Sequence, residues 1–355
     1  MTEFMGKDFL LDTECAKKLF HDFAENMPIC DYHCHLSPKE IYENKEPSDI
    51  SQLWLSGDHY KWRAMRSAGI DEKYCTGDAS GEEKFVKFGE ALQYCIGNPL
   101  YHWAHIELQR YFGIDTPLNA KTARDIYKRA NEAIKNGDFR PQSLITNSNV
   151  KVVCTTDDPI DDLKYHKLLK EVDGFDCKVL PTFRPEKALN INIDGFADYI
   201  KELGKVAEIK ISSYKDVIAA LLKRCDYFNE VGCKVSDHSF EYVPFDKASD
   251  EEIEKVFRQA MSGDVPSQAD GDKYRTAVLL ALGEKYHELD WAMEIHIGAI
   301  RNNSTRMFNA IGADTGFDSV GDCEIAITLS RFLDALDINN VLPKTILFNL
   351  NDKDN

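Results

Sequence analysis

From about residue 149 onward, short apolar runs alternate with amphipathic stretches. Together with one earlier run, these apolar segments predict six strands, at residues 27–36, 151–156, 177–180, 233–236, 291–297 and 344–350. The stretches between the strands space their apolar residues by three and four, which predicts helices. Because each strand is almost continuously hydrophobic, we expect parallel strands with helices outside them. The pattern therefore indicates an α/β protein.

The segment that follows the first strand has a purely helical pattern. Apolar residues spaced by three and four predict helices at residues 38–42, 60–68, 82–95, 100–112 and 121–135. Gly97, Gly113 and Gly137 stand where these helices would stop. We therefore expect three parts: residues 1–36 with the first strand, an α-helical insertion over 37–147, and the remaining strands and helices over 148–355.

The number of strands leaves two architectures open. A closed barrel of alternating strands and helices, the (β/α)8 or TIM-type barrel, needs eight parallel strands. A doubly wound open sheet can consist of six. No Gly-x-Gly-x-x-Gly follows any of the predicted strands, however, as a dinucleotide-binding sheet would usually show.

Charge and composition exclude several classes of partner. The net charge of −17 argues against nucleic acid or an anionic membrane surface, because binding phosphates requires clustered basic residues. No window approaches eighteen consecutive apolar residues, and the N-terminus lacks the basic and apolar regions of a signal peptide. The ten cysteines are scattered without a Cys-x-x-Cys pair. We therefore expect a cytoplasmic protein with reduced thiols and without disulfides.

The segment Asp31-Tyr32-His33-Cys34-His35 contains the first candidate for chemistry. Side chains at positions i and i+2 of a strand point to the same face, so His33 and His35 would lie together at the end of the first strand. Two imidazoles in this arrangement suit a divalent metal such as Zn²⁺. A His-x-His pair alone also occurs by chance as two ordinary polar residues, so the case depends on the other strands.

Polar residues follow the other predicted strands at the same end. Arg184 follows the third strand, Asp237 the fourth, and His296 lies at the end of the fifth. The guanidinium of Arg184 is suited to a substrate carboxylate, although an ordinary ion pair in an acidic protein is the alternative. His296 is suited to metal binding or to acid–base chemistry, and Asp237 to a substrate hydroxyl or to orienting a neighbour. Such a set at one end of parallel strands is typical of a barrel's active site. Asp157 and Asp158, before Pro159, fit a functional role at this end of the strands and an ordinary role as turn formers equally well, and Asp158 also fits a cap of the following helix.

In order along nearly the whole chain, the motifs resemble the uronate isomerase (glucuronate isomerase) family, a divergent branch of the amidohydrolase superfamily of metal-binding barrels. The segments that carry the resemblance are residues 31–36, 58–63, 155–159, 181–185, 236–238, 295–299 and 301–303. The resemblance implies a TIM-type barrel of the metal-dependent hydrolase kind, with about six of its eight strands in this chain. Family members extend further, into two more strands that carry an Asp-x-Arg with another metal ligand, so the chain resembles a C-terminally truncated member.

The resemblance also implies roles for individual residues. They are a zinc ion bound by His33 and His35, catalysis by Tyr60, Asp237 and His296, and substrate binding by His59 and Arg184. The family interconverts D-glucuronate with D-fructuronate and D-galacturonate with D-tagaturonate. This reaction moves a proton between C2 and C1 through an enediol or enediolate, which requires a base, a proton donor and stabilisation of negative charge on oxygen. The resemblance does not decide between Tyr60 and metal-bound water as the base, and a phenol with a pKa near 10 would need help from a metal or a cation.

We therefore expect a cytoplasmic uronate isomerase that acts on a small sugar acid, depends on a divalent metal and forms a homo-oligomer. The rival enzyme is a metal-dependent hydrolase of the same superfamily, since related barrels use a similar His-x-His to activate water. The rival from another class is an inactive truncated remnant that binds a sugar acid or a partner chain. Arg184 favours an acidic sugar over a neutral ester or amide.

Overall fold

The computed structural model of the protein describes residues 4–355, which form two compact units. The chain passes between the units several times. The first unit consists of residues up to Ile29 together with Glu43–Asn149 and Arg301–Asp318, and the second of Cys30–Tyr42, Val150–Ile300 and Ser319–Asn355. Each unit has its own hydrophobic core.

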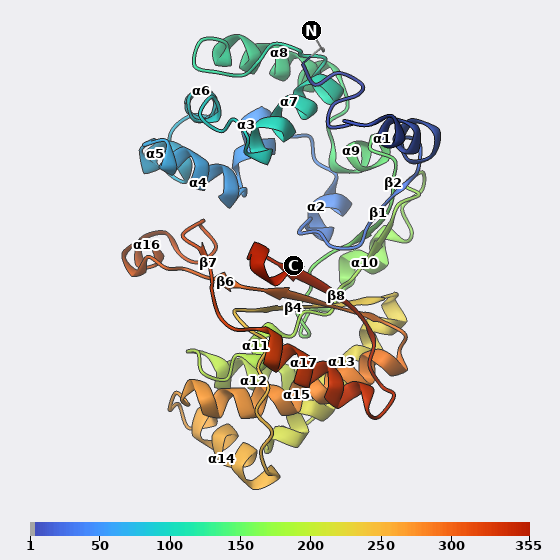
Figure 1. Cartoon of the computed structure of the whole chain (residues 1–355), viewed down its shortest axis with the longest axis vertical. Helices are drawn as coiled ribbons and strands as arrows, with labels where there is room; N and C mark the ends of the chain where they lie inside the picture. The colour runs from blue at the N-terminus through green and yellow to red at the C-terminus, as the bar shows by residue number, and fades with distance from the viewer. Residues whose placement is uncertain (1–3) are drawn as a thin grey trace. The chain divides into compact units, whose positions relative to one another are not determined.

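The first unit is helical (Figure 1). Its helices are α1 (Glu14–Leu19), the π-helix η1 (Phe20–Ala24), α3 (Ile50–Leu55), α4 (His59–Ser67), α5 (Glu72–Cys75), α6 (Gly81–Leu92), α7 (Pro99–Phe112), α8 (Ala123–Asn136), α9 (Pro141–Asn147) and α16 (Thr305–Ile311). The helices predicted at residues 60–68, 82–95, 100–112 and 121–135 are confirmed as α4, α6, α7 and α8. Trp54, Phe85, Phe88 and Leu108 are among the buried residues that join them into one core.

Local signals in the sequence set the ends of these helices. Ser80 forms a capping box with Glu83 at the start of α6, so that both orphan backbone N–H groups are bound. Asn98 caps α7, whose first residue is Pro99, and Gly113 ends α7 with a φ of 63°. A left-handed residue at this position satisfies the last carbonyls of the helix, and glycine adopts it without steric cost.

The second unit contains the parallel sheets. The strands of the chain are β1 (Ile29–Asp31), β2 (Val150–Cys154), β3 (Lys178–Leu180), β4 (Val235–Phe240), β5 (Ala292–Ile297), β6 (Ala299–Ile300), β7 (Ser319–Val320) and β8 (Lys344–Asn349). One three-stranded sheet has the order β1-β2-β3, a second has the order β4-β5-β8, and β6 and β7 form an antiparallel ribbon. Parallel bridges from Asp157 to Phe183 and from Phe183 to Ser236 continue the pairing between β2, β3 and β4. A strand is therefore found at each of the six predicted places, in the predicted order along the chain, although the bounds of β1 and β4 differ from the prediction.

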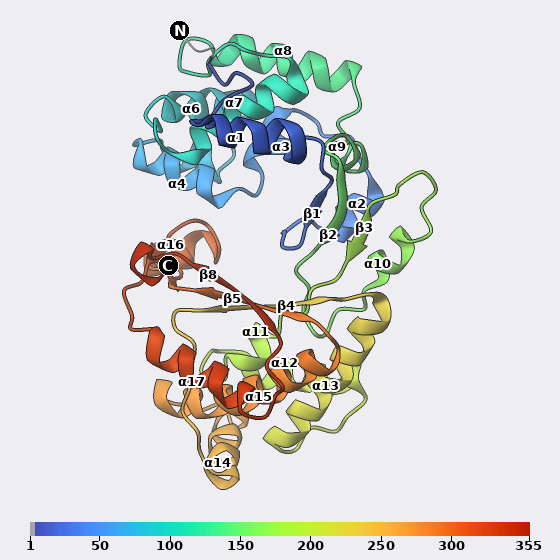
Figure 2. The same cartoon turned by 45° about the vertical axis from the view of Figure 1, so that its right-hand side comes forward.

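Helices cover one side of the β4-β5-β8 sheet, as two views show (Figure 1, Figure 2). The helices of this unit are α2 (Pro38–Glu43), which reaches the boundary of the unit, α10 (Lys164–Leu169), α11 (Glu186–Leu189), α12 (Phe196–Ala207), α13 (Tyr214–Val231), α14 (Asp250–Met261), α15 (Gln268–Glu288), α17 (Ala326–Asp337) and the 3-10 helix η2 (Asp352–Asp354). Met293, Ile295 and Ile297 of β5 point into the core formed with these helices. The alternate residues of β5, Glu294 and His296, therefore face the opposite side of the sheet.

The structure is thus a mixed α/β fold with parallel sheets. All ten cysteines lie within the described residues, and each is a free thiol. Among residues 4–355, no helix combines the length and the apolar character that crossing a membrane requires.

Candidate active site

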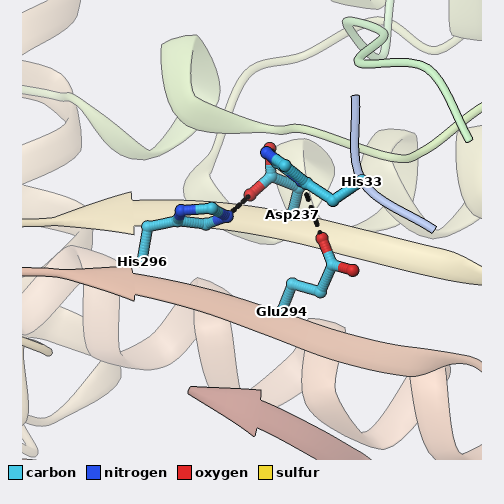
Figure 3. Close-up of side chains that lie close together, drawn as sticks. All are labelled: His33, Asp237, Glu294 and His296. Carbon is cyan, nitrogen blue, oxygen red and sulfur yellow. Dashed lines mark hydrogen bonds and ion pairs between the residues drawn. The ribbon is translucent and has the colours of Figure 1, made fainter. Parts of the chain in front are cut away.

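Neighbouring strands bring polar residues together on the face of the β4-β5-β8 sheet opposite the helices that cover it. β4 and β5 are parallel, and their register places Asp237 directly beside Glu294. His296 lies two residues after Glu294 and thus on the same face of β5. His33 approaches from the segment that follows β1 (Figure 3).

His33, Asp237, Glu294 and His296 form one compact group (Figure 3). One ligand atom from each of the four lies within 4.8 Å of the others. His33 Nδ1 is 2.9 Å from Glu294 Oε2 and 4.0 Å from Asp237 Oδ2, and His296 Nε2 is 3.3 Å from Asp237 Oδ1. Asp237 and Glu294 are completely buried, whereas the two imidazoles are partly exposed.

The donor set fits a divalent metal ion. Within residues 4–355, Asp237 Oδ1, Glu294 Oε1 and His296 Nε2 are buried without a hydrogen-bond partner. Such orphaned polar atoms are rare and costly in folded proteins, and two buried carboxylates side by side are costlier still. A cation bound by two imidazoles and two carboxylates would satisfy all of these atoms, and this mixed set of nitrogen and oxygen ligands suits Zn²⁺ and related ions.

The protonation of the group follows from its burial. Burial lowers the pKa of His296 to about 4, so that the neutral imidazole able to bind a metal is its stable form near neutral pH. Burial alone would also lower the pKa of His33, but the hydrogen bond to Glu294 and the nearby Asp237 together raise it. Burial raises the pKa of Glu294, although the hydrogen bond with His33 and the charge of His33 act to lower it.

Arg184 borders this group from the residues after β3. Its Nη1 donates to Asp237 Oδ2 at 2.8 Å, and its Nη2 donates to Glu186 Oε1 at 2.7 Å. Burial opposes its charge, but the two carboxylates raise the pKa of Arg184, so that the side chain stays cationic. The structure thus brings Arg184, Asp237, His296 and His33 together as expected, although β4 extends to Phe240 and Asp237 therefore lies within this strand and not after its end.

His35 is placed differently from the expectation. β1 ends at Asp31, so His33 and His35 follow the strand and do not lie on it, although the Cys34 backbone N–H still donates to the Cys154 carbonyl at 3.0 Å. The prediction of a strand over residues 27–36 was too long at both ends, and Pro28, which cannot donate a hydrogen bond to the sheet, directly precedes the observed strand. The ring of His35 is 5.2 Å from that of His33, but His35 is not part of the four-residue group.

His59 and Tyr60 belong to the first unit, at the start of helix α4. Asp58 caps this helix and accepts hydrogen bonds from the backbone of Tyr60 and Lys61. The Tyr60 side chain is exposed, whereas His59 Nε2 is buried and lacks a hydrogen-bond partner among the described residues. Burial lowers the pKa of His59, so its imidazole is neutral near pH 7.

Glu294 is the member of the group that the sequence interpretation missed. The signal was present: Glu294 is a charged residue within an otherwise apolar strand, two positions before His296. The same i, i+2 argument that connected His33 with His35 would have placed Glu294 and His296 on one face. A carboxylate inside a buried strand is an indication of a site, because it is seldom buried without a partner.

Comparison with known proteins assigns the fold and the residue pattern to a family. The glucuronate isomerase family model matches residues 1–355, which is the whole chain. This chain belongs to the glucuronate isomerase family. Within that family it is similar to the uronate isomerase of Caldanaerobacter subterraneus subsp. tengcongensis, with 53% identity over 351 residues that cover 99% of this chain and 75% of the relative. The uronate isomerase of Clostridium acetobutylicum is 51% identical over 355 residues, covering 100% of this chain and 76% of the relative.

A solved structure agrees with the family assignment. The crystal structure of uronate isomerase from Thermotoga maritima superposes with a TM-score of 0.92 at 32% sequence identity. The superposition covers 99% of this chain and 76% of that chain. The arrangement of strands and helices described above is therefore the one adopted by a glucuronate isomerase family member.

Proposed function

We propose that this protein is a uronate isomerase, which interconverts D-glucuronate with D-fructuronate and D-galacturonate with D-tagaturonate. The observation that carries the proposal is the buried group of His33, Asp237, Glu294 and His296, bordered by Arg184, in a chain that matches the family over its whole length. Acid–base groups and a cationic clamp are what the isomerisation of an acidic sugar requires.

Within this proposal, Arg184 binds the C6 carboxylate of the substrate. Its guanidinium is already oriented by Asp237 and Glu186, which leaves it little conformational entropy to lose on binding. Asp237 and His296 form the catalytic side of the pocket. Tyr60 is the candidate for proton transfer between C2 and C1, with His59 beside it as a substrate-binding residue; their ring centroids are 4.3 Å apart.

A divalent metal, and zinc in particular, is the cofactor that we propose. His33 is a ligand in both of the sets considered, either with His35 or with Asp237, Glu294 and His296. When bound, the metal would stabilise negative charge on the substrate oxygens. The buried oxygens of Asp237 and Glu294 that lack a hydrogen-bond partner support the second set. In the described chain, Arg184 and the imidazoles are the only cationic groups within reach of these oxygens.

The wider setting of this site completes the proposal. We assign the parallel strands β1, β2, β3, β4, β5 and β8 to a (β/α)8 barrel of the amidohydrolase type, and residues 37–147 to an insertion after its first strand. The protein acts in the cytoplasm as a homo-oligomer, with a small sugar acid as its partner and without nucleic acid or membrane. The ten free thiols fit a reducing compartment.

Incubation of the purified protein with D-glucuronate or D-galacturonate and Zn²⁺, with ketose formation followed over time, tests the isomerase function. We expect a ketose product from at least one uronate. Hydrolysis of ester or amide substrates without ketose formation would favour the metal-dependent hydrolase. Uronate binding without any turnover would favour a non-catalytic binding protein. The relative rates of the two uronates would also decide which of them is preferred.

A further inference from the structure

Residues 301–318 form a strap that packs within the helical unit. The strap follows β5 and β6 and precedes β7, but its own residues cluster with the first unit. It contains helix α16 and a turn at Thr315–Asp318. The turn lies against helix α4, which carries His59 and Tyr60 at its first two positions.

Two arginines of α4 hold the backbone of the strap. Arg63 Nε donates to the Gly316 carbonyl at 2.9 Å, and Arg66 Nη1 donates to the Thr315 carbonyl. Arg66 also lies over the Phe317 ring, with its guanidinium carbon 4.4 Å from the ring centroid. Positions 59, 63 and 66 of a helix share one face, so the strap covers the face that includes His59. The Arg63 guanidinium in addition lies 5.5 Å from the centroid of the Tyr60 ring.

Asp318 fixes the other end of the turn. Its side chain is 7% exposed and is 3.5 Å from Arg63 Nη2 and 3.2 Å from Arg301 Nη1. It also accepts the Asn302 backbone N–H at 2.9 Å. Asp318 is thus a nearly buried carboxylate that contacts three donors, and it connects the end of the strap to Arg63.

Gly316 permits the closest approach between the strap and the helix. It is buried and has a φ of 94°, and a Cβ built on it would lie 2.6 Å from the His59 carbonyl oxygen. A backbone atom cannot move aside as the end of a side chain can, so a larger residue here must displace either the strap or the first turn of α4. Gly312 lies in the same strap with a similar φ of 87°, but among the described residues no atom lies within 4 Å of its added Cβ.

We propose that the Thr315–Asp318 turn of the strap, held by Arg63 and made possible by Gly316, is a positioning element that fixes His59 and Tyr60 for the isomerisation. The proposal deepens the proposed function and depends on it, because it assigns the turn a role in the reaction. Arg63 is a positioning residue, since it contacts both the strap backbone and the Tyr60 ring.

The pair Gly316→Ala and Gly312→Ala tests this proposal. Both substitutions place a side chain at a positive φ, but only the first forces a contact with α4. We expect Gly316→Ala to lower kcat for the preferred uronate at least 10-fold while KM changes less than threefold, and Gly312→Ala to keep kcat within twofold of the parent. Equal kcat values for the two variants would overturn the proposal.

Hydrogen exchange of the α4 amides separates a failure of this proposal from a failure of the proposed function. In Gly316→Ala we expect faster exchange at residues 59–66 than in Gly312→Ala, whether or not the protein has isomerase activity. If the parent protein makes no ketose and exchange differs between the variants, the function is wrong and the positioning of α4 by the strap is supported. If exchange at α4 is the same in both variants, the positioning is wrong.

A second pair covers the case in which Gly316→Ala does not fold. Arg63→Met removes the contacts with Gly316, Asp318 and Tyr60, and Arg129→Met on α8 is the control. The two arginine side chains are 40% and 41% exposed, and each pairs with one carboxylate at 3.5 Å. We expect a fall in kcat of at least 10-fold and faster α4 exchange only for Arg63→Met. Indistinguishable results for the two variants would contradict the role of Arg63.

Discussion

Among single residues, Asp237 combines complete burial with three partners in the candidate site. It has no solvent exposure, yet it faces Arg184, His296 and His33 within 4.0 Å. Such a carboxylate is stable only because cationic or polar groups surround it, and removal of one partner leaves a charge without compensation. The partners of Asp237 are therefore coupled, and a substitution at one of them should affect the others.

Arg184→Met should weaken uronate binding. The substitution removes a charge-assisted pair with the substrate carboxylate, worth about 1.5–3 kcal/mol, which corresponds to a rise in KM of roughly 10- to 100-fold. Steady-state kinetics with the preferred uronate provide the measurement. Lys187→Met is the control, because Lys187 follows Arg184 closely but is 63% exposed and pairs with Asp158. An unchanged KM in Arg184→Met would refute the role of Arg184 as the carboxylate clamp.

Another buried carboxylate, Asp157, lies shortly after β2. It accepts hydrogen bonds from Thr155 Oγ1 at 2.6 Å and from the Thr182 backbone N–H at 3.2 Å, and Thr155 also contacts His166 Nε2 at 2.8 Å. Burial raises the pKa of Asp157 to about 7 and lowers the pKa of His166 to about 4. Both side chains are therefore neutral over much of the range between these values. Of the two readings of Asp157 left open by the sequence, this network favours a structural residue.

Asp157→Asn should change how stability depends on pH. Between the unfolded value of 3.8 and about 7, the folded protein keeps the Asp157 proton and the unfolded chain loses it, so the free energy of unfolding falls as pH rises. The slope from this group is at most about 1.4 kcal/mol per pH unit, and it vanishes above about pH 7. Urea denaturation from pH 4.5 to 8 should show that the variant lacks this slope. Asp198→Asn, at an exposed position on α12, should keep the parent slope in that range. Parallel curves for Asp157→Asn and the parent would contradict the pKa shift.

The elements of the fold differ in how clearly the sequence predicts them. Long helices such as α7 and α8 have several turns of apolar spacing, α7 also has recognisable caps, and both helices were predicted. Short elements have too few residues for a period to emerge. Helix α5 and the two-residue strands β6 and β7 were accordingly not predicted. Helix α5 packs against its chain neighbours α4 and α6, whereas β6 and β7 form only by pairing with each other.

Asp58→Ala tests the start of helix α4. Loss of the cap should reduce the free energy of unfolding by about 1 kcal/mol, because the N–H groups of Tyr60 and Lys61 lose their acceptor. Asp58→Asn should retain most of that stability. Asp71→Ala removes the cap of α5 and should cost a similar amount without lowering isomerase activity, whereas Asp58→Ala should lower it. Thermal denaturation and kcat, measured on the same samples, test these expectations. Full activity in Asp58→Ala would show that isomerase activity does not require the fixed start of α4.

At the scale of the whole molecule, the chain assembles its candidate site from segments that are far apart in sequence. His33 and Glu294 are separated by 261 positions yet share a hydrogen bond of 2.9 Å. Parallel strands with intervening helices make this possible, because they bring every strand end to the same edge of the sheet. A metal site made of these four residues would therefore form only in the folded unit, and metal binding should stabilise that unit.

Metal content and stability test the two possible ligand sets. We expect elemental analysis to find one Zn²⁺ per chain in the parent protein and in the control variant Glu241→Gln. Glu241 is an exposed carboxylate just after β4. Glu294→Gln should lose the metal if the four-residue group binds it, and His35→Asn should lose it if His35 is a ligand. Zinc at 100 times its Kd should raise the free energy of unfolding by about 2.7 kcal/mol, and chelation should remove that increment. Equal zinc content in all of these variants and in His33→Ala would exclude a site at His33.

The sequence by itself determined the alternation of strands and helices, the chemistry at the strand ends and the family. Apolar periodicity is local information, and the polar residues in or just after β3, β4 and β5 follow from their positions in or next to those runs. Only the tertiary structure decided that Glu294 joins His33, Asp237 and His296, since this depends on the register between β4 and β5. It also decided that Gly316 meets the His59 carbonyl, a contact that no local pattern encodes. Register and backbone approach arise from the packing of the whole chain, and packing is a sum over residues that lie far apart in the sequence.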